Sequence, residues 1–285
     1  MPLHLKGSTM GLVVNTNVSS LNAQRSLASS SIELKTAMER LSSGKKINSA
    51  ADDAAGFAIA ERMTAQIRGL NMAAKNANDG LSMLATIENA TNDVTDMLQR
   101  IRELAVQAVN DTNGSTDRSY LQAEVTSLLA EIDRVATQTV YNNKVLLDGS
   151  LSGNIQVGTE ATQSITFSID SIATADIGDG VTALSAIDVT TSSDASDALV
   201  VISGAIEQVA GQRASYGAMQ NRLEYTVSNL LNVAEFTTAA RSRIEDADFA
   251  GESARLSKAQ VLQQTGTAML AQANAASQLA LQLIR

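Results

Sequence analysis

Residues 63–108 read MTAQIRGLNMAAKNANDGLSMLATIENATNDVTDMLQRIRELAVQA, and core-type residues recur in this stretch at alternating steps of four and three. Such spacing is typical of a helix that packs along a coiled-coil seam. The steps slip once, beside Gly80, where two steps of three follow each other. The seam positions are Met63, Ile67, Leu70, Ala74, Ala77, Leu81, Leu84, Ile87, Thr91, Val94, Leu98, Ile101, Ala105 and Ala108.

This pattern predicts a helix far longer than a small globular domain needs. Ser49, followed three residues later by Asp52, resembles a capping box and predicts a helix start near residue 49. The polar run at residues 110–115, NDTNGS, predicts a loop, and a second seam from Leu121 to Val135 follows it and ends near Tyr141. Two long helices joined by a short loop are expected to form an antiparallel pair.

The amino-acid composition changes between about residues 148 and 196, where Ser, Thr, Gly and Asp dominate. Ile155 and Val157 alternate with polar residues, as do Ile165, Phe167 and Ile169. A period of two predicts strands, so we expect a β-hairpin here, with more short strand or loop after it. Helical spacing resumes at about residue 197 and continues to Ile244, with several polar seam positions that predict partner helices in a bundle.

After a break at residues 246–251 the tail returns to helical spacing, and the N-terminal arm mirrors it with Leu27, Leu34 and Leu41 seven residues apart. The expected seam of the tail is Ala259, Leu262, Gly266, Met269, Ala273, Ala276, Ala280 and Leu283. We expect these two arms to pair with each other. They carry more apolar residues than one seam uses, which favours burial against neighbouring subunits, with a packed intramolecular bundle as the alternative. The residues expected to make polymer contacts are Leu27, Leu34, Met38, Leu41, Leu262, Met269, Leu279, Leu283 and Ile284.

The predicted fold class is mostly α: a long antiparallel helical bundle or coiled coil formed by both chain ends, with a small β-rich insert in the middle. Residues 1–9 are interpreted as an added leader or a miscalled start, because Met10 opens a run that reads like a second start. The expected divisions are arms at 10–48 and 248–285, core helices at 49–148 and 197–247, and a β-hairpin with a short variable region at 149–196.

Composition excludes many chemistries. The chain has no Cys, one His and one Pro, and the His and Pro both lie in the first nine residues. A disulfide, a thiolate nucleophile, a zinc–cysteine site and a serine–histidine relay are therefore excluded beyond residue 9. The net charge is −9, with 21 basic and 30 acidic residues, which argues against nucleic-acid binding. No apolar run is long enough to span a membrane, and no Sec-type signal follows Met10.

The densest acidic clusters are Asp52-Asp53 and Glu245-Asp246-Asp248, and both lie near predicted helix boundaries, where carboxylates cap helices. The sequence Gly178-Asp179-Gly180 fits a turn better than a cation site. We expect no catalytic residue, no metal site and no cofactor.

Several motifs carry a resemblance to a known family. Residues 40–56, RLSSGKKINSAADDAAG, and residues 14–17, VNTN, are similar to the N-terminal signature of bacterial flagellin. Core-helix matches are LQRIRELAVQ at 98–107, QAEV at 122–125 and EIDR at 131–134. C-terminal matches are IEDAD at 244–248, ANAA at 273–276 and QLIR at 282–285. The resemblance covers nearly everything from Met10 onward except about residues 150–200.

The resemblance implies a structural subunit that polymerises into the extracellular filament of the bacterial flagellum for swimming motility. It implies inner-tube arms, a shell of long helices, and export by the flagellar type III route without a cleaved signal peptide. The implied partners are copies of the same chain together with flagellar export chaperone, cap and junction proteins; neither nucleic acid nor membrane is among them. The insert matches the family's variable outer region, and its Ser/Thr density would permit O-glycosylation.

The resemblance further implies that the chain is a ligand of the animal Toll-like receptor 5. The residues that match the contact motif are Gln99, Arg100, Leu104, Leu121 and Glu124. Helical spacing places Leu104 off the core stripe, on a face with Arg100 whose native role is expected to be packing between subunits. Three alternatives stay open: a hook–filament junction protein of the same superfamily, an enzyme displayed on such a scaffold, and a surface adhesin.

Overall fold

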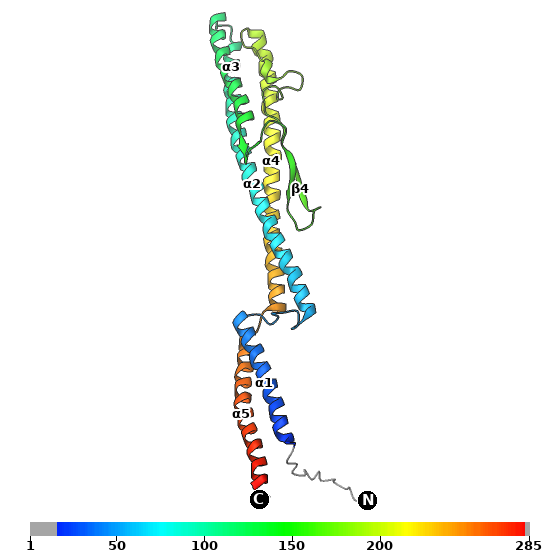
Figure 1. Cartoon of the computed structure of the whole chain (residues 1–285). Coiled ribbons are helices and arrows are strands. Elements are labelled where there is room, and N and C mark those ends of the chain that lie inside the picture. The colour runs from blue at the N-terminus through cyan, green and yellow to red at the C-terminus, as the bar shows by residue number, and fades with distance from the viewer. Residues whose placement is uncertain (1–15, 283–285) are drawn as a thin grey trace, which may run out of the picture. The chain divides into compact units, whose positions relative to one another are not determined.

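The computed structural model describes the backbone of residues 16–282 and the side chains of residues 16–276. The expected fold class is confirmed: long helices dominate, and small strands lie in the middle of the chain (Figure 1). The helices are α1 (Val18–Ser43), α2 (Ala54–Val109), α3 (Ser115–Gln138), α4 (Ser192–Glu245) and α5 (Phe249–Gln282). Between α3 and α4 lie β1 (Val140–Tyr141), β2 (Lys144–Val145), β3 (Ser152–Gln156), β4 (Ser164–Ser168) and the 3-10 helix η1 (Leu184–Ala186).

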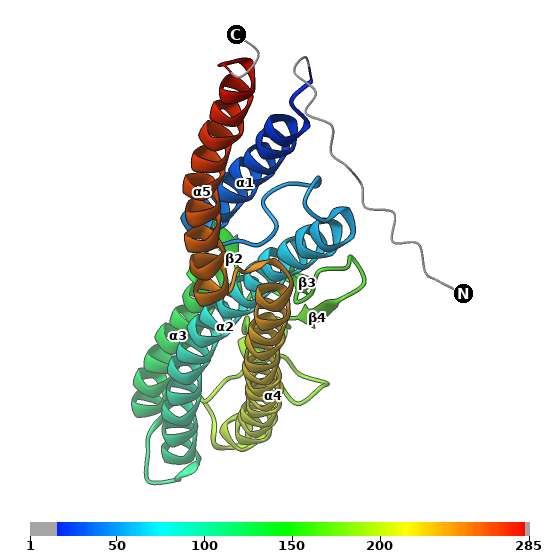
Figure 2. The same cartoon turned by 90° about the horizontal axis from the view of Figure 1, so that it is seen from below.

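The chain forms two compact units. The first unit comprises residues up to 64 and from 238 onward, so it holds α1, α5, the first turns of α2 and the last turns of α4. The second unit comprises residues 65–237 and holds the rest of α2 and α4, together with α3 and all the strands. Figures 1 and 2 show α1 and α5 side by side in the first unit, and α2 between α3 and α4 in the second.

The seam of α2 is buried along most of its length, as its spacing predicts. Leu84, Ile87, Leu98 and Ile101 are among the largest fully buried side chains of the described chain. The polar seam residue Thr91 is fully buried as well, and its hydroxyl donates to the carbonyl of Ile87 at 2.9 Å. The seam therefore forms the main core of the second unit, with α3 and α4 packed on two sides of α2.

The start of α2 differs from the expected capping box. The helix begins at Ala54, and Asp53 caps it: its Oδ1 accepts from the amides of Ala55 at 3.1 Å and Gly56 at 3.0 Å. Asp52 Oδ2 instead accepts from the amides of Asn48 and Ser49, at 3.0 and 2.9 Å, and closes the preceding turn. The prediction of a start at Ser49 was wrong because the Ser-x-x-Asp spacing forms a turn here.

The end of α2 is capped from other elements. Arg118 of α3 donates from Nε to the carbonyl of Ala108 at 2.7 Å and from a terminal nitrogen to that of Asn110 at 3.2 Å. Ser192, the first residue of α4, donates to the carbonyl of Val109 at 2.8 Å. These bonds satisfy carbonyls that a helix end leaves without partners, and they confirm the predicted loop near residues 110–115.

A two-strand turn follows α3, where the sequence predicted only the end of a helix. Val140 pairs with Val145 and Tyr141 with Lys144, in antiparallel register. Asn142 and Asn143 connect the strands with φ of 48° and 62°, a left-handed pair that suits a two-residue hairpin turn. The helical pattern therefore stops at Gln138.

The predicted β-hairpin is confirmed as β3 and β4, which pair antiparallel with Ile155 opposite Ile165. It packs on α2 at two glycines that are eleven residues apart and so lie on one face of the helix. A Cβ at Gly80 would lie 2.6 Å from Ile155 Cδ1, and a Cβ at Gly69 would lie 2.6 Å from Thr159 Cγ2. The phase slip beside Gly80 thus coincides with the place where the hairpin approaches the helix backbone.

The strap segment, residues 169–190, has little regular structure but fills part of the core. Ile172, Leu184 and Val189 are fully buried. Asp133 of α3 accepts from the amide and hydroxyl of Thr174, at 2.8 and 2.9 Å, and holds the segment in place. The sequence predicted more short strand or loop here, and the structure shows an irregular chain whose apolar side chains belong to the main core.

α4 starts five residues before the predicted position. Thr191 Oγ1 accepts from the amide of Asp194 at 3.1 Å and donates to its carboxylate at 2.6 Å, which caps the helix. Among the polar seam residues, Arg213 bonds Glu88 of α2 through Nε and a terminal nitrogen, at 3.1 and 2.6 Å. The expectation that partner helices cover polar seam positions is confirmed at this site.

Candidate functional site

The α1/α5 pair is antiparallel, as four contacts along its length show. Asn17 Nδ2 donates to the carbonyl of Ala273 at 2.8 Å, and Arg40 lies 3.2 Å from the carboxylate of Glu252. Between these ends, Ser20 Oγ donates to Asn274 at 2.9 Å, and Leu27 approaches Gly266 so closely that a Cβ there would lie 3.3 Å from Leu27 Cδ1. The two residue numbers of each contact add to nearly the same value, so one register holds throughout the pair.

α1 contributes a heptad face to this pair. Leu27, Leu34 and Leu41 are half-buried, as the seven-residue spacing predicts. Ser20, Ser30 and Ala37 are the buried residues of this helix. Small residues alternate with leucines on the inner face, which allows the two helices to approach closely.

Only some of the predicted seam residues of α5 face α1. Ala259, Gly266 and Ala273 lie in the seam, as expected. Leu262 and Met269 do not, because they are 40% and 63% exposed. The other inner positions, which are buried or half-buried, are Glu252, Leu256, Gln263 and Leu270.

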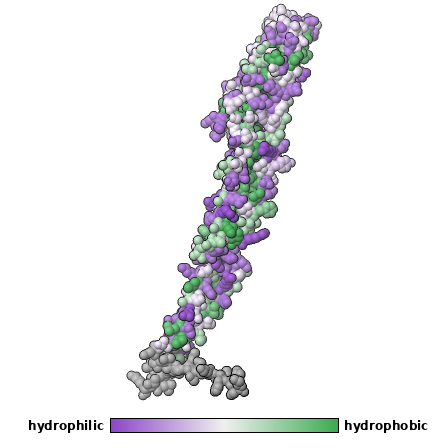
Figure 3. Space-filling model, turned by 90° about the vertical axis from the view of Figure 1, so that its right-hand side faces the viewer, coloured by the Kyte–Doolittle hydropathy of each residue, from purple (hydrophilic) through white to green (hydrophobic). Residues whose placement is uncertain are grey.

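An apolar surface remains on the outside of the α1/α5 pair. On α1, the side chain of Ile32 is 68% exposed and that of Met38 is 55% exposed. On α5, Val261 is 58% exposed, in addition to Leu262 and Met269. Figure 3 shows hydrophobic side chains interspersed among hydrophilic ones on the face it displays. Of the remaining predicted polymer contacts, the side chains of Leu279, Leu283 and Ile284 lie outside the described residues.

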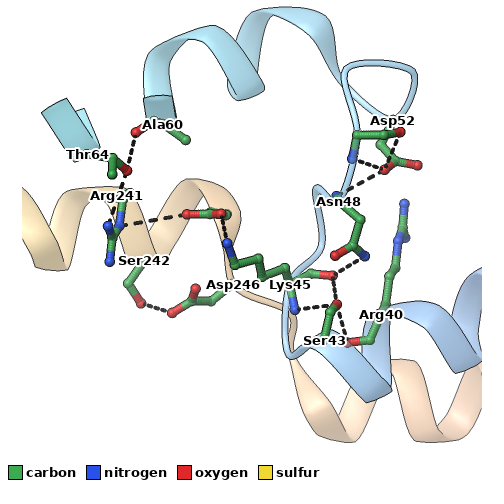
Figure 4. Close-up of polar contacts among 12 residues, drawn as sticks. Arg40, Ser43, Lys45, Asn48, Asp52, Ala60, Thr64, Arg241, Ser242 and Asp246 are labelled. Atoms are coloured by element: carbon green, nitrogen blue, oxygen red, sulfur yellow. Dashed lines mark hydrogen bonds and ion pairs between the residues drawn. The ribbon is translucent and has the colours of Figure 1, made fainter. Parts of the chain in front are cut away.

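Two connectors, residues 44–53 and 246–248, are tied together in the first unit (Figure 4). Lys45 Nζ lies 2.5 Å from Glu245 Oε1, and Arg241 Nε lies 3.7 Å from Glu245 Oε2. The carbonyl of Glu245 accepts from the amide of Lys46 at 2.6 Å, and the amide of Ala247 donates to the carbonyl of Gly44 at 3.0 Å. Glu245 therefore joins the end of α4 to the connector that leads into α2.

The acidic clusters weighed as catalytic candidates have structural partners. Glu245 is ion-paired, and Asp248 Oδ1 accepts from the amide of Ala250 at 3.0 Å. Hydrogen bonds from the backbone amides of Ser49 and then Asn48 lower the pKa of Asp52, which fits a turn-closing carboxylate. Within the part of the chain that the structure describes, no cluster of three or more acidic or histidine side chains could hold a metal ion.

The Gly178–Gly180 motif forms a turn. Asp179 Oδ1 accepts from the amides of Val181 and Thr182, at 2.9 and 2.6 Å, and these bonds lower the pKa of its carboxyl, with the Thr182 amide as the larger cause. Gly180 has φ of 87°, in the left-handed region that favours glycine. The turn interpretation of this motif is confirmed.

The face predicted around Arg100 is only partly exposed. Arg100 lies 2.9 Å from the carboxylates of Glu124 on α3 and Glu103 on α2, and hydrogen bonds to Glu103 and then Glu124 raise its pKa. Gln99 is exposed beside it, and Leu121 is half-buried. This arrangement brings four of the five predicted residues, Gln99, Arg100, Leu121 and Glu124, to the surface of the α2/α3 pair.

Leu104 is the exception, because only 2% of it is exposed and it belongs to the main core. The expectation that it lies off the core stripe was wrong. A helix with one partner buries a narrow stripe, whereas α2 packs on both α3 and α4 and buries a wider arc. Leu104 falls inside that wider arc.

The negative net charge of the chain is concentrated in one segment, residues 145–212, that no sequence motif marks. Residues 145–212 contain no Lys, Arg or His, and their nine acidic residues equal the net charge of −9 of the whole chain. All nine side chains are exposed, and none forms an ion pair within the described residues. They are Asp148, Glu160, Asp170, Asp176, Asp179, Asp188, Asp194, Asp197 and Glu207.

In the described chain, no helix is both apolar and long enough to cross a bilayer. Two family models match the sequence: the bacterial flagellin N-terminal helical region at residues 14–152, and the bacterial flagellin C-terminal helical region at residues 199–284. Their matches leave out residues 153–198, which hold most of the hairpin and the strap segment.

Similar proteins match over nearly the whole chain. A flagellin of Halalkalibacterium halodurans is 42% identical over 275 residues, covering 96% of this chain and 100% of the relative. The flagellar filament 33 kDa core protein of Treponema phagedenis is 40% identical over 291 residues, covering 96% and 100%. Among solved structures, a putative flagellar hook-associated protein from Vibrio parahaemolyticus matches with a TM-score of 0.59 and 14% identity, covering 68% of this chain and 100% of that one.

Proposed function

This chain belongs to the bacterial flagellin family, and from that premise we propose that it polymerises with copies of itself into the extracellular flagellar filament that drives swimming. Full-length relatives are named as flagellin and as a filament core protein, so the family assignment is to structural filament proteins and not to enzymes. The expectation that the chain has a structural and not an enzymatic role is therefore confirmed.

The observation that carries the proposal is the apolar outer surface of the α1/α5 pair. Ile32 and Val261 are more than half exposed on two described helices that pack extensively on each other in the first unit. Exposed apolar surface of this kind marks a site of protein association. A second copy of the α1/α5 pair presents the same small and apolar side chains. Repeated addition of subunits would therefore bury this outer surface.

Within this proposal the predicted contact residues divide into two groups. Leu27, Leu34 and Leu41 hold α1 on α5, and they shape the surface without reaching the neighbour. Met38, Leu262 and Met269 are exposed and contact the neighbouring subunit. Leu279, Leu283 and Ile284 are assigned to the same polymer contact on their sequence alone.

We assign residues 10–48 and 248–285 to an inner tube, and residues 49–148 and 197–247 to the surrounding shell. Residues 149–196 are assigned to the outer surface, where their unpaired acidic side chains would contact solvent. Export by the flagellar type III route, without a cleaved signal peptide, is proposed together with contacts to export chaperone, cap and junction proteins. A chain with no Cys and one Pro suits passage in an unfolded state, because it forms no disulfide and few slow prolyl isomers.

The α2/α3 face with Gln99, Arg100, Leu121 and Glu124 is proposed to pack between subunits, and to be the surface that Toll-like receptor 5 binds in free monomers. Arg100 already pairs with two carboxylates, so a partner must compete with Glu103 and Glu124 for its guanidinium. Breaking the half-exposed ion pairs of Arg100 requires little free energy, because exposed ion pairs contribute little stability.

The test is polymerisation of the purified chain from Met10 onward, seeded with filament fragments and followed by electron microscopy. The matched variants are Ile32→Ser with Val261→Ser, which alter the outer surface, and Ser31→Ala, which changes an exposed residue of α1 without apolar contacts to lose. We expect long filaments from the parent and from Ser31→Ala, and at least a tenfold higher critical concentration for the double variant. Equal filament growth by all three proteins would refute the assignment.

A hook–filament junction protein of the same superfamily is the second candidate, and a putative hook-associated protein from Vibrio parahaemolyticus has a similar fold. That likeness is at 14% identity and speaks for the fold alone, whereas the filament proteins match at 40–42% over their full length. Growth distinguishes the two functions: a junction protein stops at short oligomers at any monomer concentration, and a filament subunit continues to elongate.

A further inference from the structure

Methionine carries all the sulfur of this chain, because the sequence has nine Met and no Cys. Within the described side chains, three of these thioethers are exposed: Met38 at 55%, Met72 at 56% and Met269 at 63%. Met38 lies on α1 and Met269 on α5, whereas Met72 lies on α2. Two of the three exposed thioethers therefore belong to the α1/α5 pair, whose outer surface we propose as the polymer contact.

The other methionines with described side chains are shielded. Met83 is 9% exposed and belongs to the main core, and the remaining ones are half-buried. An oxidant must reach the lone pair of the sulfur atom, so exposure controls how fast a thioether is oxidised. A dilute peroxide is therefore expected to reach Met38, Met72 and Met269 first.

Oxidation reverses the character of a methionine side chain. The sulfur lone pair attacks one oxygen of hydrogen peroxide, an S–O bond forms as the O–O bond breaks, and the peroxide is reduced by two electrons to water. The thioether is flexible and apolar, whereas the sulfoxide is polar and chiral. Burying a polar oxygen against an apolar neighbour without a hydrogen-bond donor costs free energy.

The surface around Met269 is suited to an apolar neighbour. Leu262 precedes Met269 by two helical turns, so both side chains project from the same side of α5. Leu262 is 40% exposed, and Gly266 between them faces Leu27 of α1. Exposed apolar side chains in a row of this kind indicate a site of protein association.

We propose that Met38 and Met269 form a redox-sensitive site on the polymer surface, where methionine oxidation and subunit addition exclude each other. This inference rests on the proposed function. A subunit oxidised before assembly presents two sulfoxides where its neighbour presents apolar side chains, so it adds poorly to a filament end. In an assembled subunit the neighbour covers both thioethers, so a peroxide reaches them slowly. One contact thus accounts for both effects.

The first test is assembly after oxidation. The full chain is treated with dilute hydrogen peroxide, the peroxide is removed with catalase, and the critical concentration is measured with filament seeds. We expect an increase of about tenfold or more, because two apolar side chains are lost from the contact. Met38→Leu with Met269→Leu conserves volume and forms no sulfoxide at either position, so it should polymerise like the untreated parent before and after treatment.

Met72→Leu is the matched control for that double variant. It removes an equally exposed thioether outside the α1/α5 pair, so after oxidation it should lose assembly as the parent does. Equal loss in Met38→Leu with Met269→Leu would overturn the inference. Normal assembly of a parent oxidised at both Met38 and Met269 would overturn it as well.

The second test needs no variant, because trypsin places the exposed methionines on separate peptides. Met38, Met72 and Met269 fall in residues 36–40, 69–75 and 259–285, each with a single methionine. Monomers and filaments are treated with peroxide, with free methionine added to both samples to report the dose, and sulfoxide is followed by mass spectrometry. We expect Met38 and Met269 to oxidise several-fold more slowly in the filament than in the monomer.

The outcomes separate this inference from the function on which it rests. Equal oxidation rates of Met38 and Met269 in monomers and in intact filaments would overturn the redox-sensitive site and leave the filament function standing. A lack of filaments from the untreated chain would contradict the proposed function and this inference with it.

Discussion

Lys45 Nζ, in the connector that follows α1, lies 2.5 Å from Oε1 of Glu245, the last residue of α4. Figure 4 shows the polar contacts around Lys45. The side chain of Glu245 is only 15% exposed, and Arg241 approaches its other oxygen. Because the backbone of Glu245 also binds the amides of Lys46 and Ile47, this residue fixes the connector through both its side chain and its main chain.

Replacing Lys45 by Met should therefore weaken the connector. We expect the free energy of unfolding to fall by about 0.5–1 kcal/mol, since Lys45 is half exposed and such pairs contribute modestly. The measurement is thermal unfolding followed by circular dichroism. Lys46→Met is the control, because the adjacent Lys46 side chain is exposed, and it should stay within about 0.5 kcal/mol of the parent. The same loss in both variants would show that the Lys45–Glu245 pair has no specific role.

Gly266→Leu should separate the two arms. A Cβ at this position already lies 3.3 Å from Leu27 Cδ1, so a longer side chain must push α1 away from α5. We expect earlier cleavage of α1 and α5 in limited proteolysis and loss of filament growth. Ala268→Leu adds the same side chain at an exposed position two residues away and should leave the pair intact. Comparable protease resistance in the two variants would contradict the register described for the α1/α5 pair.

Arg100→Ala should weaken assembly and signalling through Toll-like receptor 5 while changing the free energy of unfolding by no more than about 1 kcal/mol, because its ion pairs are half exposed. Leu104→Ala should instead cost about 2–4 kcal/mol, since it empties a core position that is only 2% exposed. Stability is measured by denaturant unfolding, and function by filament growth and a receptor reporter assay. Normal filaments together with normal signalling in Arg100→Ala would refute the proposed face.

Assembly should depend on ionic strength because every subunit brings the same unpaired acidic segment. Nine exposed carboxylates without a cation among residues 145–212 repel their copies in a polymer, and salt screens that repulsion. We expect the critical concentration to fall as NaCl rises from about 20 to 200 mM, a range over which the screening length shortens several-fold. A variant with Asp176, Asp179, Asp188 and Asp197 changed to Asn should show a flatter dependence; an unchanged slope would rule out this segment as the cause.

Tyr216 should ionise later than an ordinary tyrosine, because burial and Asp170 raise its pKa to about 12. The folded state then holds the phenolic proton more tightly than the unfolded state, whose tyrosine pKa is about 10. This contribution to stability is fully present below pH 10 and is lost as the pH rises from about 10 to 12. In an absorbance titration at 295 nm, one of the four tyrosines should titrate late. Tyr216→Phe should abolish that late phase, and its persistence in the variant would assign it to another residue.

Much of the fold follows from local periodicity, and the seam of α2 is the clearest case. Alternating steps of four and three predicted a long helix whose buried side chains include Leu84, Ile87 and Leu98, and a period of two predicted the β3/β4 hairpin. These patterns are legible in sequence because a regular element repeats its exposure at fixed intervals.

The residues at which helices begin and end were harder to predict from the sequence, because more than one residue could cap each helix. The Ser49–Asp52 spacing has the form of a capping box, yet Asp53 binds the first amides of α2. Tyr141-Asn142-Asn143 reads as a helix end, yet its two asparagines adopt φ values above zero and join two strands. Competing local hydrogen bonds of similar strength decide such cases, and the surrounding chain selects among them.

Which residues lie on the candidate surface depends more on how the helices pack than on the spacing of apolar residues in the sequence. The sequence placed Leu262 in the α5 seam and Leu104 on an outer face, and both assignments were wrong for one reason. Each helix carries apolar residues on more than one side, so the repeat alone does not show which side meets a partner. The position of α2 between two helices buries Leu104, and the register of α1 against α5 exposes Leu262.

By itself, the sequence determined the elements: which stretches are helical, where the hairpin forms, and that both ends carry surplus apolar surface. Local geometry sets these features, because the repeat of each element is written in consecutive residues. Only the tertiary structure decided which faces are covered, how the strap segment enters the core, and which polar atoms on α4 are buried. Those outcomes depend on contacts between residues far apart in the chain, such as Asp133 with Thr174, whose pairing no local repeat encodes.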